Sequence, residues 1–329
     1  MDADLFAKEW QVDFVKLDGC FSDVKAKAIG YPEFGRHLNK SGRPIVYSCS
    51  WPSYLIDLAI TPNYTALVET CNLWRNYDDV EDSWASVLNI IEYYAKEQDS
   101  IGKYHGPGHW HDADMLIIGN FGLSYEQSRS QMAIWCVMGV PLFMSTDLTK
   151  MRPELKKILL NEMAIKINQD PLGKFGRRIT NRKGVQIWRR PIFPSSHNYY
   201  SFAVAILNAR VDGTPILISR TIEQLGLYNP NGYKIEDVFQ GTCATVKPRQ
   251  TVTSKIPPSG VVFWKFTVIA DESSDEHPCS QYVNKRPINS LGPYYVYAVG
   301  LIYVLGIGSL ITMFFRGKIG KRVFRVVKV

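Results

Sequence analysis

The chain has 329 residues and a formal charge of +7. Six of these positive charges lie in the last fourteen residues, which hold no acid, so residues 1–315 carry a net charge of only +1. This balance excludes the basic surface that nucleic-acid-binding proteins need, and the length allows more than one domain.

The first half of the chain alternates short apolar strands with helical segments. A strand within residues 12–20 is followed by a helix around 32–38, a strand over 44–50 and a helical stretch that contains residue 63. Next come a strand over 71–77, a helix over 82–96, a strand end at 108–115, a helix over 125–138 and a strand over 141–147. This alternation is typical of a parallel α/β domain.

Polar residues follow the predicted strands at regular intervals. They are Asp18, Ser50, Asp79, Asp114 and Asp147, separated by 32, 29, 35 and 33 residues. Each interval is the length of one βα unit, as in a (β/α)8 barrel. A doubly wound sheet is the alternative, but no glycine-rich phosphate turn follows the first strand. We predict a TIM barrel of about five βα units over residues 1–176, which is incomplete because a whole barrel has eight.

The composition changes near residue 177. Short β-rich segments separated by Gly, Pro and Asn predict an antiparallel β-sandwich domain over residues 177–270. Residues 271–293 read as a polar linker, and the 22 residues 294–315 lack any charged side chain, which predicts a transmembrane helix. The basic tail 316–329 is then expected in the cytosol, and the preceding domains in a lumen or outside the cell.

Cysteines and sequons also favour an oxidising compartment. Asn39 and Asn63 each begin an Asn-X-Ser/Thr sequon, and the chain has six cysteines. Cys49 and Cys71 flank one βα unit and could be bridged, whereas Cys136 lies in an apolar helix and is expected to be a buried thiol. No signal peptide is recognisable at residues 1–10, so we expect either that the predicted membrane helix directs entry into the compartment or that this sequence lacks its true start.

Two strand ends combine a cation with a carboxylate. Lys16 and Asp18 are two apart, so a strand points both to one side, and the cation favours the ionised carboxylate. Asp79 follows a strand that ends in Arg75. Both aspartates are expected to face one pocket, and two close carboxylates are typical of a retaining glycosidase. The simpler alternative is that they cap turns and helices.

A histidine-rich stretch offers a metal site as another interpretation. His105, His109 and His111 precede Asp112 and Asp114 at a predicted strand end. Such a set could bind a metal, as in metal-dependent hydrolases. Only His37 adds another histidine before residue 170, so carboxylates would have to complete the site. We therefore favour a hydrogen-bonding role for the two aspartates.

Six motifs resemble those of one known family. They are V-K-L-D-G-C at 15–20, Y-S-C-S-W-P at 47–52, C-N-L-W-R-N-Y-D-D at 71–79, G-P-G-H-W at 106–110, I-G-N-F-G-L-S at 118–124 and I-N-Q-D-P-L-G at 167–173. Over about residues 4–268 the chain resembles the α-galactosidases and α-N-acetylgalactosaminidases of glycoside hydrolase family 27. The resemblance implies a lysosomal homodimer without metal or other cofactor. Its implied substrates are glycolipids and glycoproteins with terminal α-GalNAc or α-galactose.

The resemblance also implies roles for individual residues. Asp18 matches the nucleophile, and Asp79 matches the general acid/base, with a pKa raised by burial and a nearby anion. The matches to sugar-binding residues are Lys16, Tyr54 and Arg75. Cys49 and Cys71 match a disulfide of the family.

Specificity is expected to depend on Ser50 and Ser53. By the resemblance, the matching positions look like Glu and Leu in the α-galactosidases, and like Ser and Ala in the N-acetylgalactosaminidases. Two small side chains leave room for a 2-acetamido group, so the resemblance implies removal of terminal α-linked N-acetylgalactosamine. The alternatives are an α-galactosidase, and an inactive incomplete barrel that only binds glycans or a partner subunit.

Overall fold

The computed structural model describes residues 2–270 apart from residues 57, 197 and 211. The linker, transmembrane helix and basic tail predicted over residues 271–329 lie outside the described residues. Within the described part of the chain, no helix is both long and apolar enough to cross a membrane.

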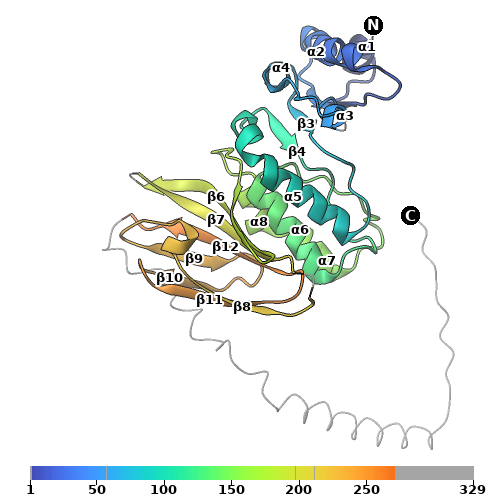
Figure 1. Ribbon diagram of the computed structural model, residues 1–329. Helices are drawn as coiled ribbons and strands as arrows, with labels where there is room; N and C mark the ends of the chain where they lie inside the picture. Colours follow the sequence, from blue (N-terminus) through green and yellow to red (C-terminus); the bar gives the residue numbers. More distant parts are fainter. Residues whose placement is uncertain (1, 57, 197, 211, 271–329) are drawn as a thin grey trace, which may run out of the picture. The chain divides into compact units, whose positions relative to one another are not determined.

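A parallel four-stranded sheet, in the order β1-β2-β3-β4, organises the first part of the chain (Figure 1). Its strands are β1 (Phe14–Leu17), β2 (Val46–Cys49), β3 (Leu73–Arg75) and β4 (Trp110–Asp112). The helices are α1 (Asp2–Asp4), η1 (Leu5–Glu9), α2 (Val24–Lys40), α3 (Ser53–Ile56), α4 (Tyr64–Thr70), α5 (Trp84–Ile101), η2 (Gly102–Tyr104), α6 (Tyr125–Met138), α7 (Pro153–Leu159) and α8 (Glu162–Asn168). Parallel pairing puts the carboxyl ends of all four strands at one edge of the sheet.

The strand register gives the sheet two faces. One row of register partners consists of Leu17, Cys49, Trp74 and His111. Trp74 and His111 are fully buried, and both rings contact Tyr64 of α4. This row therefore faces the helices. Because side chains alternate along a strand, the residues on either side of the row face the opposite way.

The fifth predicted strand, over residues 141–147, is reduced to a single bridge. Leu116 forms an isolated parallel bridge with Met144, supported by backbone hydrogen bonds of 2.6 Å from Leu116 N to Phe143 O and 2.9 Å from Ser145 N to Leu116 O. Pro141 has no N–H to pair, and Asp114 has a φ of +69°, which ends the extended backbone after β4. The described residues therefore hold four parallel strands and one isolated parallel bridge instead of five strands.

From Arg177 onward the chain forms the predicted antiparallel β-sandwich. One sheet has the order β10-β9-β12-β7-β6-β5, and the other pairs β11 with β8. The strands are β5 (Arg177–Arg182), β6 (Val185–Ser196), β7 (Tyr199–Asn208), β8 (Ile216–Thr221), β9 (Tyr233–Asp237), β10 (Cys243–Val246), β11 (Thr251–Ile256) and β12 (Val261–Val268), with η3 (Glu223–Leu225) after β8. Apolar side chains of both sheets, such as Ile218, Val252 and Phe266, pack in one buried cluster.

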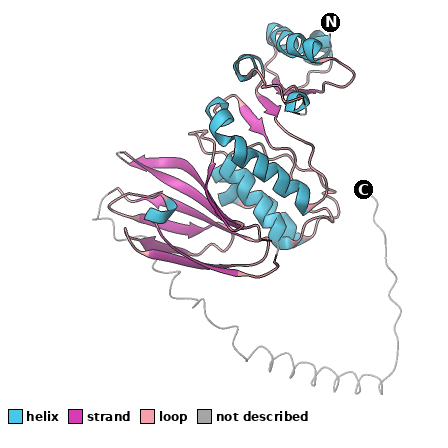
Figure 2. Ribbon diagram, in the orientation of Figure 1, coloured by secondary structure: helices cyan, strands magenta, loops and turns pink. Residues whose placement is uncertain are grey.

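Helix α6 packs against this sandwich and lies beside α5 (Figure 2). It begins at a capping box made by Ser124 and Gln127, and it ends at Gly139, whose φ of +78° suits glycine. Every residue from Gln131 to Met138 is buried, because β7 and β12 cover one side of the helix and α8 and α5 cover others. The helix thereby connects the parallel sheet to the sandwich.

Candidate active site

The open face of the parallel sheet carries most of the predicted site residues. Lys16 pairs in register with Ser48, and Arg75 pairs with Asp112. Continuing each strand by one residue places Asp18 beside Ser50, and the Ser50 amide donates to the carbonyl of Leu17 over 3.3 Å. These side chains point away from the row that faces the helices. The sheet therefore brings predicted residues from four strands to one edge.

Asp18 is held as an acceptor at the end of β1. Its carboxylate accepts hydrogen bonds from the Tyr54 hydroxyl and, at 2.7 Å, from the Gly19 amide. The Tyr54 hydrogen bond is the largest cause that lowers the pKa of Asp18, and the charge of Lys16 adds a smaller effect. The sequence predicted an ionised Asp18 with Lys16 as the cause; the direction is right, but the main cause is Tyr54.

The turn after Asp18 needs a glycine. A Cβ atom on Gly19 would lie 2.6 Å from Cε of Lys27 and 2.7 Å from a ring carbon of Tyr54. The Lys27 ammonium lies 4.5 Å from the centre of the Tyr54 ring. This close packing fixes the ring on α3 while its hydroxyl reaches Asp18.

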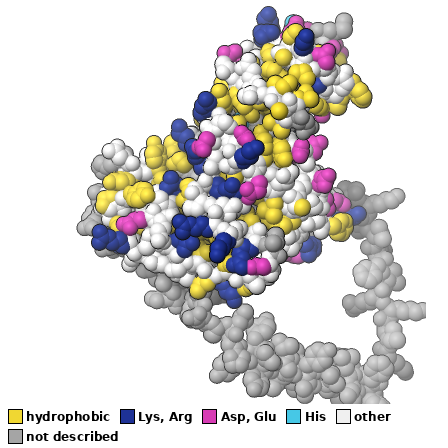
Figure 3. All heavy atoms as spheres, in the orientation of Figure 1, with side chains coloured by type: hydrophobic (Ala, Val, Ile, Leu, Met, Phe, Trp, Pro, Cys, Tyr) yellow, Lys and Arg dark blue, Asp and Glu magenta, His cyan; other side chains and the backbone are white. Residues whose placement is uncertain are grey.

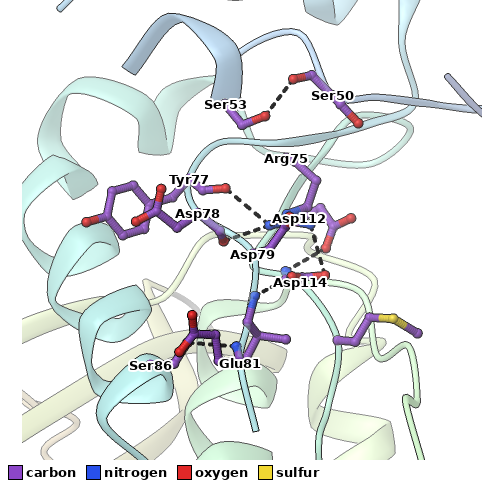
Figure 4. Close-up of polar contacts among 12 residues, drawn as sticks. Ser50, Ser53, Arg75, Tyr77, Asp78, Asp79, Glu81, Ser86, Asp112 and Asp114 are labelled. Carbon is purple, nitrogen blue, oxygen red and sulfur yellow. Dashed lines mark hydrogen bonds and ion pairs between the residues drawn. The ribbon is translucent and has the colours of Figure 1, made fainter. Parts of the chain in front are cut away.

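Arg75 links two acidic side chains at the end of β3 and β4 (Figure 4). Its Nη2 donates to Asp79 over 3.0 Å and to the carbonyls of Tyr77 and Asp78, and its Nη1 lies 3.0 Å from Asp114. The Arg75 side chain is 5% exposed, whereas that of Asp79 is 94% exposed. Asp79 is therefore not buried in the described structure, contrary to the expectation, and the guanidinium is occupied by protein acceptors.

Asp112 and Asp114 support this cluster from β4. The Asp112 carboxylate accepts the Asp114 amide over 2.9 Å, and the Asp114 carboxylate accepts the Val80 amide over 2.7 Å. Trp135 of α6 donates to the Asp114 carbonyl over 2.8 Å. Burial raises the pKa of Asp112 to about 6, against the charge of Arg75. The sequence placed Asp114 at a strand end but did not connect it to Arg75.

The two serines of the predicted specificity pocket lie just after β2. Ser50 is buried, and Ser53 donates its hydroxyl to the Ser50 carbonyl over 2.7 Å. Figure 4 shows Ser50 and Ser53 side by side above Arg75. Because the Ser53 hydroxyl already donates its hydrogen bond to the backbone, the Ser50 hydroxyl is the one that can donate to a ligand.

The histidines of the metal interpretation have protein partners. His111 Nε2 faces the Ile101 carbonyl at 2.9 Å, and its Nδ1 faces the indole N–H of Trp74 at 3.0 Å. Burial lowers the pKa of His111 to about 4, which keeps the ring neutral. His109 Nδ1 faces the Tyr104 carbonyl at 2.7 Å. Within residues 2–270, apart from the three omitted positions, no three His, Cys, Asp or Glu side chains group as metal ligands do.

The structure also describes both sequons and most of the cysteines. Cys49 and Cys71 form a disulfide, as the resemblance implied, and Cys136 is a buried thiol. Cys20 is an exposed thiol. Cys243 is disulfide-bonded, and the possible partner Cys279 lies outside the described residues. The sequon residues Asn39 and Asn63 are both exposed, and glycosylation of either remains a prediction.

Two family comparisons match this arrangement of a barrel sheet and a β-sandwich. Residues 1–170 match the family described as Alpha galactosidase A, and residues 182–266 match the Alpha galactosidase C-terminal beta sandwich domain. The chain belongs to the alpha-galactosidase A family. This family assignment agrees with the resemblance drawn from the motifs.

Curated relatives in this family include both enzyme types named by the resemblance. The chain is 50% identical over 265 residues to the alpha-N-acetylgalactosaminidase of Gallus gallus, which covers 80% of this chain and 64% of the relative. It is 46% identical to the alpha-N-acetylgalactosaminidase of Homo sapiens, covering 80% and 63%. It is 42% identical over 227 residues to alpha-galactosidase A of Homo sapiens, covering 69% and 51%. The chain therefore spans less than two thirds of the length of these relatives.

Solved structures of this family share the fold. Alpha-galactosidase I from Mortierella vinacea superposes with a TM-score of 0.70 at 23% identity, covering 82% of this chain and 71% of that one. The alpha-galactosidase of Saccharomyces cerevisiae superposes with a TM-score of 0.69 at 19% identity, covering 81% and 74%. At these identities the likeness establishes the fold of the alpha-galactosidase family alone.

Proposed function

We propose that the protein is a retaining exoglycosidase that removes terminal α-linked N-acetylgalactosamine from glycoconjugates. The observation that carries this proposal is the parallel sheet edge where Asp18, Ser50 and the Arg75–Asp79 pair stand on adjacent strands. Both carboxylates follow strands of one parallel sheet at its carboxyl edge, where the side chains of different strands can meet at one glycosidic bond. The identity to alpha-N-acetylgalactosaminidases adds support.

The proposed mechanism has two displacements. The ionised Asp18 attacks the anomeric carbon, the glycosidic C–O bond breaks, and Asp79 gives its proton to the leaving oxygen. Water then attacks the glycosyl–Asp18 ester while Asp79 takes a proton from that water, which frees the sugar with its configuration retained. The hydrogen bond from Tyr54 keeps Asp18 ionised for the first step.

The proposed mechanism can be tested directly on this chain. An aryl α-N-acetylgalactosaminide is expected to be hydrolysed, with the α anomer of the sugar appearing first by NMR. Asp18→Asn is expected to abolish turnover, and Asp79→Asn to lower kcat/KM by about 10²–10⁴. Asp78→Asn, at the neighbouring exposed position, is the control. Initial release of the β anomer, or full activity in Asp18→Asn, contradicts the mechanism.

The preference for N-acetylgalactosamine is proposed to come from the space beside Ser50 and Ser53. Ser50→Glu combined with Ser53→Leu is expected to shift the ratio of kcat/KM values toward α-galactosides, because the larger side chains fill the room for an acetamide. An unchanged ratio contradicts this account. The identity to alpha-galactosidase A supports the alternative, an α-galactosidase, which would already prefer galactosides before the substitutions.

A binding role without catalysis is the competing function. The carboxylates of Asp18 and Asp79 are solvent-exposed in the described structure, which suits a lectin-like site as well as an enzyme. A folded chain that binds N-acetylgalactosamine but shows no turnover would support this role.

The resemblance further supports a homodimer in the lumen of a lysosome or another endomembrane compartment, tethered through residues 294–315. Sedimentation and membrane fractionation test these two proposals.

A further inference from the structure

A second cavity of about 780 Å³ lies away from the proposed active site, between α5–η2 and the sandwich strands β5, β6 and β7. Two hydrogen bonds between Gln98 and the backbone of Arg178, of 2.7 and 3.1 Å, hold its two sides together. We name this cavity the basic groove. Its charged lining residues are Asp99, Lys103, Lys174, Arg177, Arg178 and Arg189.

Positive charge is concentrated in the basic groove. Five cations and one acid line it, and Glu92, which binds Arg178, brings the net charge to +3, while residues 1–315 together carry only +1. Figure 3 shows Lys and Arg side chains gathered over the body of the protein on the face drawn. A concave surface lined by one sign of charge focuses its field and raises the local concentration of counter-ions. This groove therefore favours an anion.

Two of the cations are available to a ligand. Arg177 pairs with Asp99, and Arg178 is bound by both carboxylate oxygens of Glu92 at 2.7 Å. By contrast, the structure of residues 2–270 shows no ion pair for Lys103 or Lys174, and both are exposed. These two lysines can reach a ligand without breaking an ion pair, and the Lys103 ammonium lies 5.0 Å from the centre of the Tyr104 ring.

The fifth cation and the apolar lining point to a ring-bearing ligand. Arg189 donates to the carbonyls of Leu225 and Gly226, and its guanidinium lies 5.0 Å from the centre of the Phe202 ring. Tyr200 also lines the groove and is exposed, whereas Phe175 is buried against the rings of His105 and His111. Aromatic rings beside cations suit a sugar whose C–H face stacks while its acidic group meets the lysines. A bare inorganic anion would leave these rings unused.

We propose that the basic groove binds an acidic sugar of a glycoconjugate, separately from the active-site sugar. Lys103 and Lys174 pair with the acidic group, and the aromatic side chains contact the ring. The site would give the protein a second point of attachment to an acidic glycan. This binding does not depend on turnover, so it is measurable even if the proposed glycosidase activity fails.

Calorimetric titration of the full chain with 3′-sialyllactose tests the proposal, with lactose as the neutral ligand and sodium sulfate as the free anion. Sialyllactose is expected to bind at least about tenfold more tightly than either, and more weakly as salt rises. Lys103→Glu combined with Lys174→Glu is expected to weaken binding at least about tenfold. Asp18→Asn is expected to leave binding unchanged.

Lys156→Glu combined with Lys157→Glu is the matched control. Both lysines are exposed on α7, outside the groove, and the pair changes the net charge by the same amount. If the control weakens binding equally, the effect is one of overall charge, and the proposal is overturned. It is also overturned if sialyllactose does not bind, if lactose binds equally well, or if sulfate alone matches it. Circular dichroism verifies that each variant is folded.

Discussion

The Tyr54 hydroxyl donates a hydrogen bond to the carboxylate of Asp18, 36 positions earlier in the chain. This contact joins the short helix α3 to the end of β1, two elements that β2 separates in sequence. It also sets the charge state of Asp18, because a hydrogen bond to a carboxylate favours its ionised form. The activity of the proposed nucleophile therefore depends on a residue that is not itself required to contact the scissile bond.

Tyr54→Phe is expected to raise the pKa of Asp18, since the largest cause of its lowered pKa is lost. A ¹³C NMR titration of the Asp18 carboxyl group measures this directly, and the acid limb of kcat/KM should move to higher pH with it. Tyr77→Phe is the control, because its hydroxyl pairs with Asn89 instead. An unchanged Asp18 titration in Tyr54→Phe would show that Lys16 or the Gly19 amide is sufficient.

Asp112 is expected to make stability depend on pH. Its pKa rises from 3.8 to about 6 on folding. Between these two pH values the Asp112 carboxyl group is therefore protonated in the folded protein and ionised in the unfolded chain. The protonated Asp112 therefore contributes fully to the free energy of unfolding below about pH 4. This contribution, about 3 kcal/mol, is lost as pH rises through about 6. Asp112→Asn should remove this fall in a series of urea unfolding curves. Glu69→Gln, an exposed change, should retain it.

Asp114→Asn is expected to loosen the segment that carries Asp79. The carboxylate accepts from both Arg75 and the Val80 amide, and an Asn side chain has one acceptor oxygen in place of two. Hydrogen exchange of the Val80 amide should become about tenfold faster. Asp82→Asn is a matched control, because Asp82 accepts the amides of Phe121 and Gly122 in another loop. Unchanged Val80 exchange in Asp114→Asn would show that Arg75 alone holds the segment.

Arg190 is expected to matter for stability more than any exposed arginine. It is fully buried and donates to the carbonyls of Cys136, Ile167, Asn168 and Lys174, so it ties the ends of α6 and α8 to β6. Arg190→Met leaves these carbonyls without their donor and should lower the free energy of unfolding by about 3–5 kcal/mol in urea. The exposed Arg152→Met should cost less than about 1 kcal/mol. Equal losses would contradict this role.

Local signals were sufficient for several elements. Helix α6 has the predicted bounds, because Ser124 and Gln127 cap its start and Gly139 takes the left-handed conformation at its end. The alternation along β1 was enough to place Lys16 and Asp18 on one side. Both features depend on residues close in sequence.

Features that depend on distant contacts could not be predicted in the same way. Strands β5 and β11 contain mostly polar residues, and their pairing with β6 and β8 decides their conformation. The exposure of Asp79 and the burial of Asp112 follow from how β3 and β4 pair at Arg75. The sequence analysis identified these aspartates, but the sequence alone does not show which of them the surrounding side chains bury.

The alternation along β1 also determines which genetic changes the site can tolerate. The side chains of Phe14, Lys16 and Asp18 point to one face of the sheet, and those of Val15 and Leu17 point to the other. A substitution alters one of these positions, whereas an in-frame loss of the Leu17 codon shifts the residues before it by one step relative to Asp18 and turns Lys16 toward the helices. Natural variation in this strand should therefore consist of replacements, without length changes.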